Sequence, residues 1–412
     1  MNTEICIIGA GPAGLMAAIH AAREGVTTTV LEANAEAGRK LLITGSGRCN
    51  FTHAATPDEM VRAFGTGGRF LRHCFHELSP AEIITFFRRH GLPGKVEPDG
   101  CVFPVSDRAG DVRDLLVRQA RKLGARLAFR EPVRDVAGSD AGFTVRTPQR
   151  TIPTRRLIVA TGGVTWPQTG STGDGYRFAA AFGHGIAPAR PALVTLVTRE
   201  KWPRDLAGVS VADVRMRTRI GSRKIATEGA MIFTHKGIGG PATLDLSRHA
   251  ADYLATQGRS IDLEIDLAPE TGTDALDRQM REQWAAHPKK NTANALPAFL
   301  PHRLALALCD RAACDPKSPA GQVTKDARRR LVALLKALPL RVTGTGPIEE
   351  ATVTRGGVRT KEIDPQTMES KLRPGLFFDG EILDVDGPCG GYNLQMCFST
   401  GALAGRAAAG MA

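Results

Sequence analysis

A strand, a glycine-rich turn and a helix at the start of the chain constrain its fold more than any other feature. The apolar run Ile5 to Ile8 leads into a turn of small residues and then an alanine-rich segment. Such a turn lets the backbone approach a pyrophosphate and lets the helix pack close to the strand, while the helix N-terminus offers N–H groups to phosphates. We therefore expect a dinucleotide to bind at Gly9, Ala10, Gly11, Pro12, Ala13 and Gly14.

An acidic residue follows the second predicted strand, 27–31. Glu32 and the adjacent Ala33 stand where side chains meet the adenosine ribose in this kind of domain, and a carboxylate there disfavours a 2′-phosphate. FAD or NAD therefore fits this site better than NADP. Val133 lies where a strand commonly runs beside the adenine, so we assign it to the same site.

A second glycine-rich segment stands near the C-terminus, after the apolar run 376–378. It leads to Gly391, Tyr392 and Asn393, which open a predicted helix over 391–409. The two segments together suggest a flavin, with the second one holding the ribityl chain and the ring. The N–H groups of this helix would face the ring edge where negative charge develops on reduction. A helix start with no ligand is the alternative. Further flavin contacts are expected from Gly380, Glu381 and Asp384.

The first third of the chain reads as alternating strands and helices. One strand ends in the small-residue turn Ala160, Thr161, Gly162 and Gly163, which we expect to lie beside the cofactor and contact it. From Pro191 onward, period-two alternation at 193–199, 208–220, 223–233 and 259–267 predicts a barrel-like sheet. A helical stretch broken by prolines follows. We expect a discontinuous cofactor domain with an insertion: 1–190 with 355–412, a β-barrel substrate domain of 191–271 with 339–354, and a helical subdomain of 272–338.

Composition excludes several classes of protein. With 412 residues, 42% hydrophobic and 23% charged, the chain predicts a globular protein of two or three domains. It shows no leader pattern and no apolar run of membrane-spanning length, so a cytoplasmic protein without a membrane partner is expected. The eight cysteines are scattered without ligand spacing, which favours reduced thiols and no metal site.

The net charge of +12 is concentrated in the middle of the chain. Residues 190–355 contain 26 Lys and Arg against 18 Asp and Glu. Arg215, Arg217 and Arg219 alternate along a predicted strand and would share one face. Such a surface attracts polyanions, nucleic acid above all, although a plain solvated surface is the alternative. Aromatic residues make up only 5% of the chain, so extensive base stacking is not indicated.

Motifs along the whole chain resemble those of the HI0933-like flavoproteins, often called NAD(P)/FAD-dependent oxidoreductases or aminoacetone oxidase-like. The matching stretches are 9–14, 38–40, 44–50, 102–104, 160–163, 169–175, 233–242, 367–371, 380–384 and 390–395. The resemblance implies an α/β fold: a Rossmann-like FAD-binding domain of the two-dinucleotide-binding type, with an inserted β-barrel and a helical subdomain. It also implies tightly bound, non-covalent FAD. Members are linked to reduction of carbon–carbon double bonds in bile-acid derivatives and in ribosomal RNA uridine, and to amine oxidation.

Two polar stretches after Glu32 are expected near the cofactor. A cation after Gly38 can neutralise the pyrophosphate, which points to Arg39 and Lys40. The segment 43–50 combines two glycines with Arg, Cys and Asn, an unusual surface unless a ligand covers it. A solvated loop and a structural turn are the respective alternatives. From the second segment we assign Ser46, Gly47, Arg48 and Asn50 to the flavin neighbourhood.

Reduction of an activated C=C bond needs a hydride on one carbon and a proton on its neighbour. Candidate proton donors are Cys49, Tyr392 and His235, although Cys49 can equally be a small buried residue and His235 a loop histidine. No second strand–GxGxxG–helix unit is present, so NAD(P)H would dock transiently as electron donor. We expect an FAD-dependent reductase with uridine in ribosomal RNA as leading substrate. A small-molecule enone reductase or amine oxidase, and a non-catalytic FAD-containing RNA-binding protein, are the alternatives.

Overall fold

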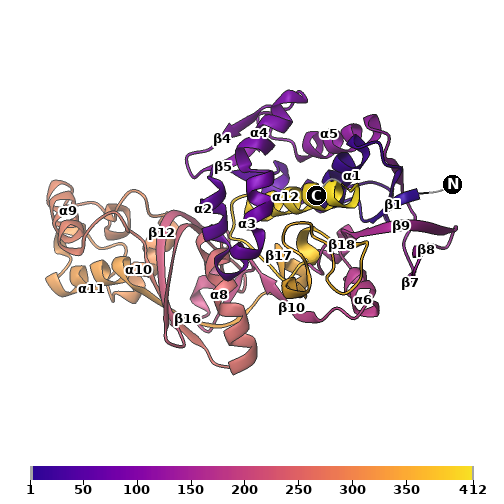
Figure 1. The fold of residues 1–412 in the computed structure, drawn as a ribbon. Helices are drawn as coiled ribbons and strands as arrows, with labels where there is room; N and C mark the ends of the chain where they lie inside the picture. The colour runs from indigo at the N-terminus through magenta and orange to yellow at the C-terminus, as the bar shows by residue number, and fades with distance from the viewer. Residues whose placement is uncertain (1–2, 411–412) are drawn as a thin grey trace. The chain divides into compact units, whose positions relative to one another are not determined.

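The computed structural model describes residues 3–410 and divides the chain into two compact units (Figure 1). The first unit comprises residues 1–190 and 348–412, and the second comprises 191–347. Each unit buries a hydrophobic cluster of its own. The separation of a helical subdomain from the barrel stays a prediction, because helices and barrel strands of the second unit contribute to one cluster.

A seven-stranded sheet forms the centre of the first unit. Its order is β6-β2-β1-β9-β8-β7, and β18 also pairs with β9. Strands β6, β2, β1, β9 and β18 run parallel, whereas β8 and β7 are antiparallel. Four consecutive residues of β1, from Ile5 to Ile8, are buried, as is usual where helices cover both faces of a parallel sheet. The strand bounds are β1 Thr3–Ile8, β2 Thr28–Leu31, β6 Arg126–Ala128, β7 Asp135–Ser139, β8 Gly142–Arg146, β9 Thr151–Val159 and β18 Leu376–Phe378.

Two helices from opposite ends of the chain pack against each other without intervening side chains. They are α1 (Pro12–Arg23) and α12 (Tyr392–Ala408), which lie side by side in Figure 1. A Cβ atom added at Gly401 would overlap the Ala13 carbonyl oxygen, and one at Gly405 would overlap that of Ala17. This contact brings the two glycine-rich segments of the sequence together.

Smaller elements surround this core. A three-stranded sheet of order β3-β5-β4 is accompanied by α2, α3, α4 and α5, and β10 pairs with β17 where the chain leaves and re-enters the first unit. The bounds are η1 Leu41–Gly47, β3 Thr52–His53, α2 Pro57–Ala63, α3 Gly68–Glu77, α4 Pro80–Arg89, β4 Gly94–Val96, β5 Cys101–Pro104, α5 Ala109–Lys122, α6 Asp174–Ala181, β10 Ile186–Ala192, β17 Val353–Val358 and η8 Gly380–Ile382.

The second unit contains a closed barrel of order β11-β14-β13-β12-β15-β16 together with five helices. Alternate residues of β15 are buried from Ile261 to Ile265, which matches the period-two pattern of the sequence. The bounds are β11 Leu196–Thr198, α7 Trp202–Asp205, β12 Ser210–Ile220, β13 Arg223–Phe233, β14 Gly237–Gly239, α8 Pro241–Gln257, β15 Ile261–Asp266, α9 Thr273–Ala286, α10 His302–Arg311, α11 Lys325–Lys336 and β16 Leu338–Thr345. The predicted fold class, a Rossmann-like domain with an inserted barrel and helices, is confirmed.

The described part of the chain shows no helix with the length and apolar character needed to cross a membrane. The cysteines within residues 3–410 form no disulfide. In the same residues, no cluster of three or more His, Cys, Asp and Glu side chains has a geometry that could hold a metal ion.

The α1–α12 contact predicts that Gly401→Ala destabilises the protein by roughly 2–4 kcal/mol, because the new methyl group meets backbone rather than a movable side chain. Gly110→Ala is the matched control, since a Cβ atom at this position in α5 has no atom within 4 Å. We expect the control to change stability by about 1 kcal/mol or less. Equal melting temperatures for the two variants would contradict the importance of this contact.

Candidate functional site

The turn after β1 is closely packed at Gly9 and Gly14 but open at Gly11. Gly9 has φ 105°, and a Cβ atom there would lie 2.5 Å from the Ala160 carbonyl oxygen at the end of β9. A Cβ atom at Gly14 would overlap the Gly9 carbonyl oxygen. At Gly11, by contrast, an added Cβ atom would have no atom within 4 Å, so this position borders open space.

The N-terminus of α1 is open to a ligand at the same place. Gly11 is its N-cap and provides no side-chain hydrogen bond. Such a helix start presents N–H groups and a positive dipole end, which suits a phosphate. Close by, the Thr161 hydroxyl after β9 is buried and has no hydrogen-bond partner among the described residues. The open side at Gly11 and the free helix N-terminus are compatible with a phosphate here, and the pyrophosphate assignment of the first glycine segment stays a prediction.

Glu32 is tied to this turn. Its carboxylate accepts hydrogen bonds from the Ala10 N–H at 2.9 Å and from the Asn34 N–H at 2.8 Å. The Glu32 carbonyl accepts from the Glu131 N–H at 2.9 Å, which brings the segment containing Val133 next to β2. The structure thus places Glu32, Ala33 and Val133 in one neighbourhood, and their role at the adenosine end stays a prediction.

Lys40 and Glu381 form an ion pair across 341 positions of sequence, with 2.8 Å between Lys40 Nζ and Glu381 Oε2. Lys40 Nζ also donates to the Thr165 hydroxyl at 2.6 Å, and the Thr354 N–H donates to Glu381 Oε1 at 2.9 Å. The sequence predicts that Lys40 contacts the pyrophosphate and that Glu381 contacts the ribityl chain. In the structure these two side chains bind each other, and both cofactor roles stay predictions. Arg39 is exposed and donates to the Asn34 side-chain oxygen at 2.8 Å.

The polar turn 44–50 is strained and anchored to the β3-β5-β4 sheet. Ser46 and Cys49 have φ 57° and 63°, in the left-handed region that non-glycine residues rarely adopt. Arg48 lies 3.8 Å over the Phe103 ring and donates to Glu97 at 2.6 Å. Such strain persists where the surrounding structure holds it, and it concentrates at functional sites.

The same turn meets the second glycine segment. Asn50 accepts from the Val102 N–H at 3.1 Å. A Cβ atom at Gly391 would lie 2.7 Å from the Asn50 side-chain oxygen, so Asn50 lies directly beside the start of α12. The Asn393 side chain closes the preceding loop by accepting from the Gly387 N–H at 2.8 Å and donating to its carbonyl at 3.0 Å.

The three predicted proton donors differ in accessibility. Cys49 has no exposed surface, and burial raises the pKa of its thiol to about 12. His235 is exposed, but it lies in the second unit on the turn between β13 and β14. Tyr392 is half-buried at the first position of α12, stacked on His53 with 4.6 Å between ring centroids.

Asp379 is a further candidate for the site, and the sequence did not single it out. Both carboxylate oxygens are buried without a hydrogen-bond partner among residues 3–410, and burial raises the pKa of this carboxyl well above its usual range. The next residue, Gly380, is packed so that an added Cβ atom would lie 2.7 Å from the Ala13 Cβ at the start of α1. The only signal in the sequence is an acid directly before a glycine at the end of an apolar strand.

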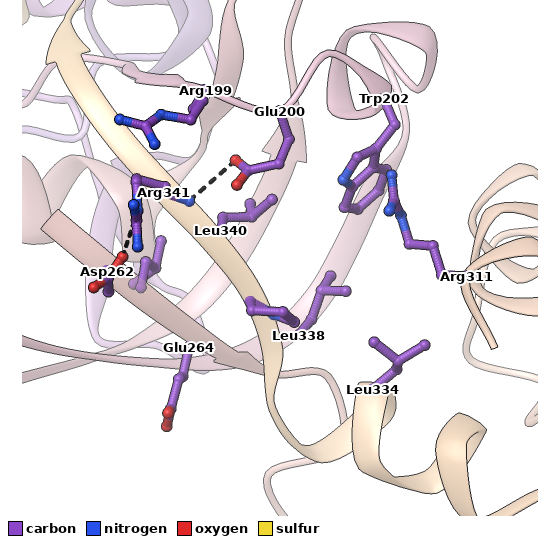
Figure 2. Close-up of a pocket in the computed structure, with 12 residues that line it drawn as sticks. Arg199, Glu200, Trp202, Asp262, Glu264, Arg311, Leu334, Leu338, Leu340 and Arg341 are labelled. Atoms are coloured by element: carbon purple, nitrogen blue, oxygen red, sulfur yellow. Dashed lines mark hydrogen bonds and ion pairs between the residues drawn. The ribbon is translucent and has the colours of Figure 1, made fainter. Parts of the chain in front are cut away.

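The second unit has a cavity of its own, of about 550 Å³ (Figure 2). Several of its polar groups already have partners. Arg341 donates to Asp262 at 2.7 Å, its N–H donates to Glu200 at 3.0 Å, and Arg311 lies 4.0 Å over the Trp202 ring. The cavity contains none of the site residues predicted from the sequence.

Comparison with known proteins identifies the family of this chain. Residues 3–407 match the family described as HI0933-like protein Rossmann domain. The chain belongs to the HI0933-like family. The 3-dehydro-bile acid delta(4,6)-reductase of Clostridium scindens is 33% identical over 409 residues, covering 98% of this chain and 99% of the relative. The ribosomal RNA dihydrouridine synthase of Escherichia coli is 31% identical over 402 residues, covering 96% of each chain.

Solved structures share the fold of this HI0933-like protein. The 3-ketosteroid-delta4-(5alpha)-dehydrogenase of Rhodococcus jostii RHA1 superposes with a TM-score of 0.54 at 18% identity, over 99% of this chain and 97% of the other. A flavocytochrome c3 fumarate reductase gives a TM-score of 0.52 at 17% identity, over 100% of this chain and 78% of the other. The predicted family and enzyme class, an FAD-dependent oxidoreductase, are confirmed by the family match and the relatives.

The residues of the HI0933-like chain fit FAD at this place. Gly11 borders open space at a helix N-terminus, and the buried Thr161 hydroxyl and Asp379 carboxyl find no hydrogen-bond partner in the described part of the chain. A dinucleotide offers phosphate oxygens and hydroxyl groups that can satisfy such atoms. We expect FAD to lie along these residues, with Asp379 added to the predicted contacts.

Gly11→Ala separates cofactor binding from folding. Its φ of −74° suits an L-residue and the added methyl group meets no protein atom, so we expect stability of the FAD-free protein to change by about 1 kcal/mol or less. We expect at least a tenfold loss of FAD affinity, because the methyl group occupies the side open to the pyrophosphate. Flavin fluorescence during titration of the FAD-free protein measures this, with Gly110→Ala as control. Unchanged FAD affinity would contradict the assignment.

Asp379 predicts a pH dependence of the FAD-free protein. Because its folded-state pKa lies above that of the unfolded chain, the unfolded state ionises more readily, and this group lowers stability as pH rises from about 4. Asp379→Asn keeps the shape without the charge, so its stability advantage over the parent should grow between pH 5 and pH 8. Urea unfolding of both proteins at the two pH values measures this. An advantage that does not change with pH would refute the raised pKa.

Proposed function

We propose that this flavoenzyme reduces an activated C=C bond with NAD(P)H and that its substrate is a uridine in ribosomal RNA, giving dihydrouridine. The observation that carries the proposal is the full-length similarity to two reductive relatives. One is named for a delta(4,6) reduction of a 3-dehydro-bile acid and the other for dihydrouridine synthesis. Both reactions add two hydrogens across a ring double bond conjugated to a carbonyl.

The charge of the second unit supports RNA over a bile acid. Residues 191–347 contain 24 Lys and Arg against 16 Asp and Glu, a net of +8, whereas the rest of the chain has +4. A polyanion gains from such a surface through release of counterions, but a small carboxylate gains little. A ribosomal substrate also implies that the enzyme works in the cytoplasm.

In the proposed reaction NAD(P)H and a proton are consumed, NAD(P)⁺ is released, and C5 and C6 of uracil each gain a hydrogen. FAD, when bound, supplies the hydride acceptor and donor that connects the two substrates. The sequence contains one strand–GxGxxG–helix unit, in β1 and α1, so we place NAD(P)H in a transient complex in the substrate cleft. The two substrates would then bind in turn.

Tyr392 is our choice of proton donor among the three candidates. Its half-buried phenol lies at the start of α12, the segment assigned to the flavin ring. Cys49 is fully buried with a raised pKa, which makes the thiol a poor partner for a docked substrate. His53, stacked on the Tyr392 ring and bonded through Nδ1 to the Gly390 carbonyl, would hold the phenol in position.

A small-molecule enone reductase is the second candidate, favoured by the 33% identity to the bile-acid reductase. Assays of the purified protein separate the candidates. Turnover of NAD(P)H with an enone and not with RNA selects it over the RNA enzyme. Oxygen uptake with amines and no need for NAD(P)H selects an amine or aminoacetone oxidase. A flavin that no nicotinamide reduces, in a protein that still binds RNA, selects a non-catalytic RNA-binding protein.

The RNA proposal predicts that dihydrouridine disappears from ribosomal RNA when the gene is deleted and returns with the wild-type copy. Mass spectrometry of ribosomal RNA nucleosides measures this directly. An unchanged dihydrouridine level in the deletion strain would exclude ribosomal RNA as the substrate.

In the same deletion strain, a copy with Tyr392→Phe should form dihydrouridine about 10²-fold or more slowly, whereas a copy with Tyr253→Phe in α8 should restore formation fully. If Tyr392→Phe fully restores dihydrouridine, Tyr392 is not the proton donor, and the proposed reaction is unaffected.

A further inference from the structure

The hairpin of β12 and β13 carries a group of exposed cations at its end. Arg219 pairs with Lys224 on the opposite strand, and Arg217 lies two residues before Arg219. The side chains of Arg217, Arg219 and Lys224 therefore lie on one face of the hairpin. Arg223 pairs with Ile220 at the turn, on the opposite face of the same hairpin. All four side chains are exposed. We call Arg217, Arg219, Arg223 and Lys224 the hairpin patch.

The four cations form no ion pair within residues 3–410, in contrast to Arg215, the preceding residue on the face of Arg217 and Arg219. Arg215 forms an ion pair with Glu228, the residue directly opposite on β13. Arg219, however, has the like-charged Lys224 opposite it, an arrangement that destabilises an isolated hairpin. A bound anion would reverse this unfavourable term.

The end of the hairpin extends beyond its neighbouring strand. Strand β15 pairs with β12 only from Arg215 to Thr218, and its Glu264 is the carboxylate that faces Arg217. No strand pairs with Arg219 on that side, so the end of the hairpin is a two-stranded ribbon. The cations at this end are therefore free of a covering strand on the β15 side and can approach a phosphate backbone.

Another run of basic residues in the second unit, Arg328 to Arg330, is partly engaged within the protein. Arg328 bonds to Asp277 at 2.8 Å, and Arg330 bonds to the Ala312 carbonyl at 2.7 Å. The run Arg328 to Arg330, conspicuous in the sequence, is therefore largely used for packing of α11. The hairpin patch remains available for a partner.

We propose that the hairpin patch binds the sugar–phosphate backbone of RNA, an inference that rests on the proposed RNA substrate. The segment 210–230 contains no aromatic residue, so it offers charge without base stacking. The described part of this segment also shows no exposed large hydrophobic side chain, which a membrane-binding loop needs for insertion. A flexible, strongly charged polymer of phosphates is the partner that this chemistry fits.

The test compares two triple variants of the full chain with FAD bound. In one, Arg217, Arg219 and Lys224 are replaced by Gln. In the control, the exposed Lys289, Lys290 and Lys325 of the same unit are replaced by Gln, which removes the same charge elsewhere. Binding of a ribosomal RNA fragment is measured by fluorescence anisotropy between 50 and 300 mM salt, and flavin absorbance with melting temperature reports folding.

We expect the patch variant to bind RNA roughly 10–100-fold more weakly at 100 mM salt, with the slope of log K against log salt reduced by about 2. The control should stay within about threefold of the parent, since its lysines lie outside the patch. Equal loss in the two variants, or an unchanged salt slope in the patch variant, overturns the proposal.

Dihydrouridine formation is scored separately from binding. If the parent binds RNA through the patch but forms no dihydrouridine, the proposed reaction fails and the binding surface stands. If the parent forms dihydrouridine and the patch variant binds like the control, the surface fails and the reaction stands. Reduction of the bound flavin by NAD(P)H at the parental rate shows that the cofactor site of the patch variant is intact.

Discussion

The direct backbone contact between α1 and α12 is the constraint on which the cofactor domain depends. Because Gly401 and Gly405 have no side chain, the backbone of α12 packs directly on the backbone of α1 at Ala13 and Ala17. Gly380, which follows β18, also lies against Ala13 at the start of α1, so residues from both ends of the chain lie together. The central sheet alone would bring together the residues after β1, β2, β9 and β18, but it would not place the start of α12 beside them.

Two acidic residues at this junction have different electrostatic environments. Lys40 and Glu381 neutralise each other, and the Thr354 N–H adds a third element to the same carboxylate. Asp379 lies two positions before Glu381 but has no partner among the described residues, and its pKa is raised. One acid therefore stabilises the protein itself, while the other is suited to a hydroxyl group of a ligand.

The sequence predicts those parts of the fold that local patterns specify. The turn Gly9–Gly14, the alternating strands of the barrel and the helix that became Tyr392–Ala408 all carry their own signals. The Lys40–Glu381 pair could not be predicted, since nothing local links residues 341 positions apart. The sequence left Cys49 open between a proton donor and a small buried residue. It could not decide, because the turn that holds Cys49 is surrounded by residues from β5 and the start of α12 that are far away in the sequence.

The insertion has a consequence for synthesis of the protein. Residues 191–347 leave from β10 and return to β17, which pair with each other, so this unit closes on itself and can form while translation continues. The first unit must wait, because α1 finds its partner only when α12 has left the ribosome. During that interval the apolar face of α1 needs protection from wrong contacts, and such long-range closure is slow. FAD can then act late in biogenesis, as a ligand that locks the two ends once they meet.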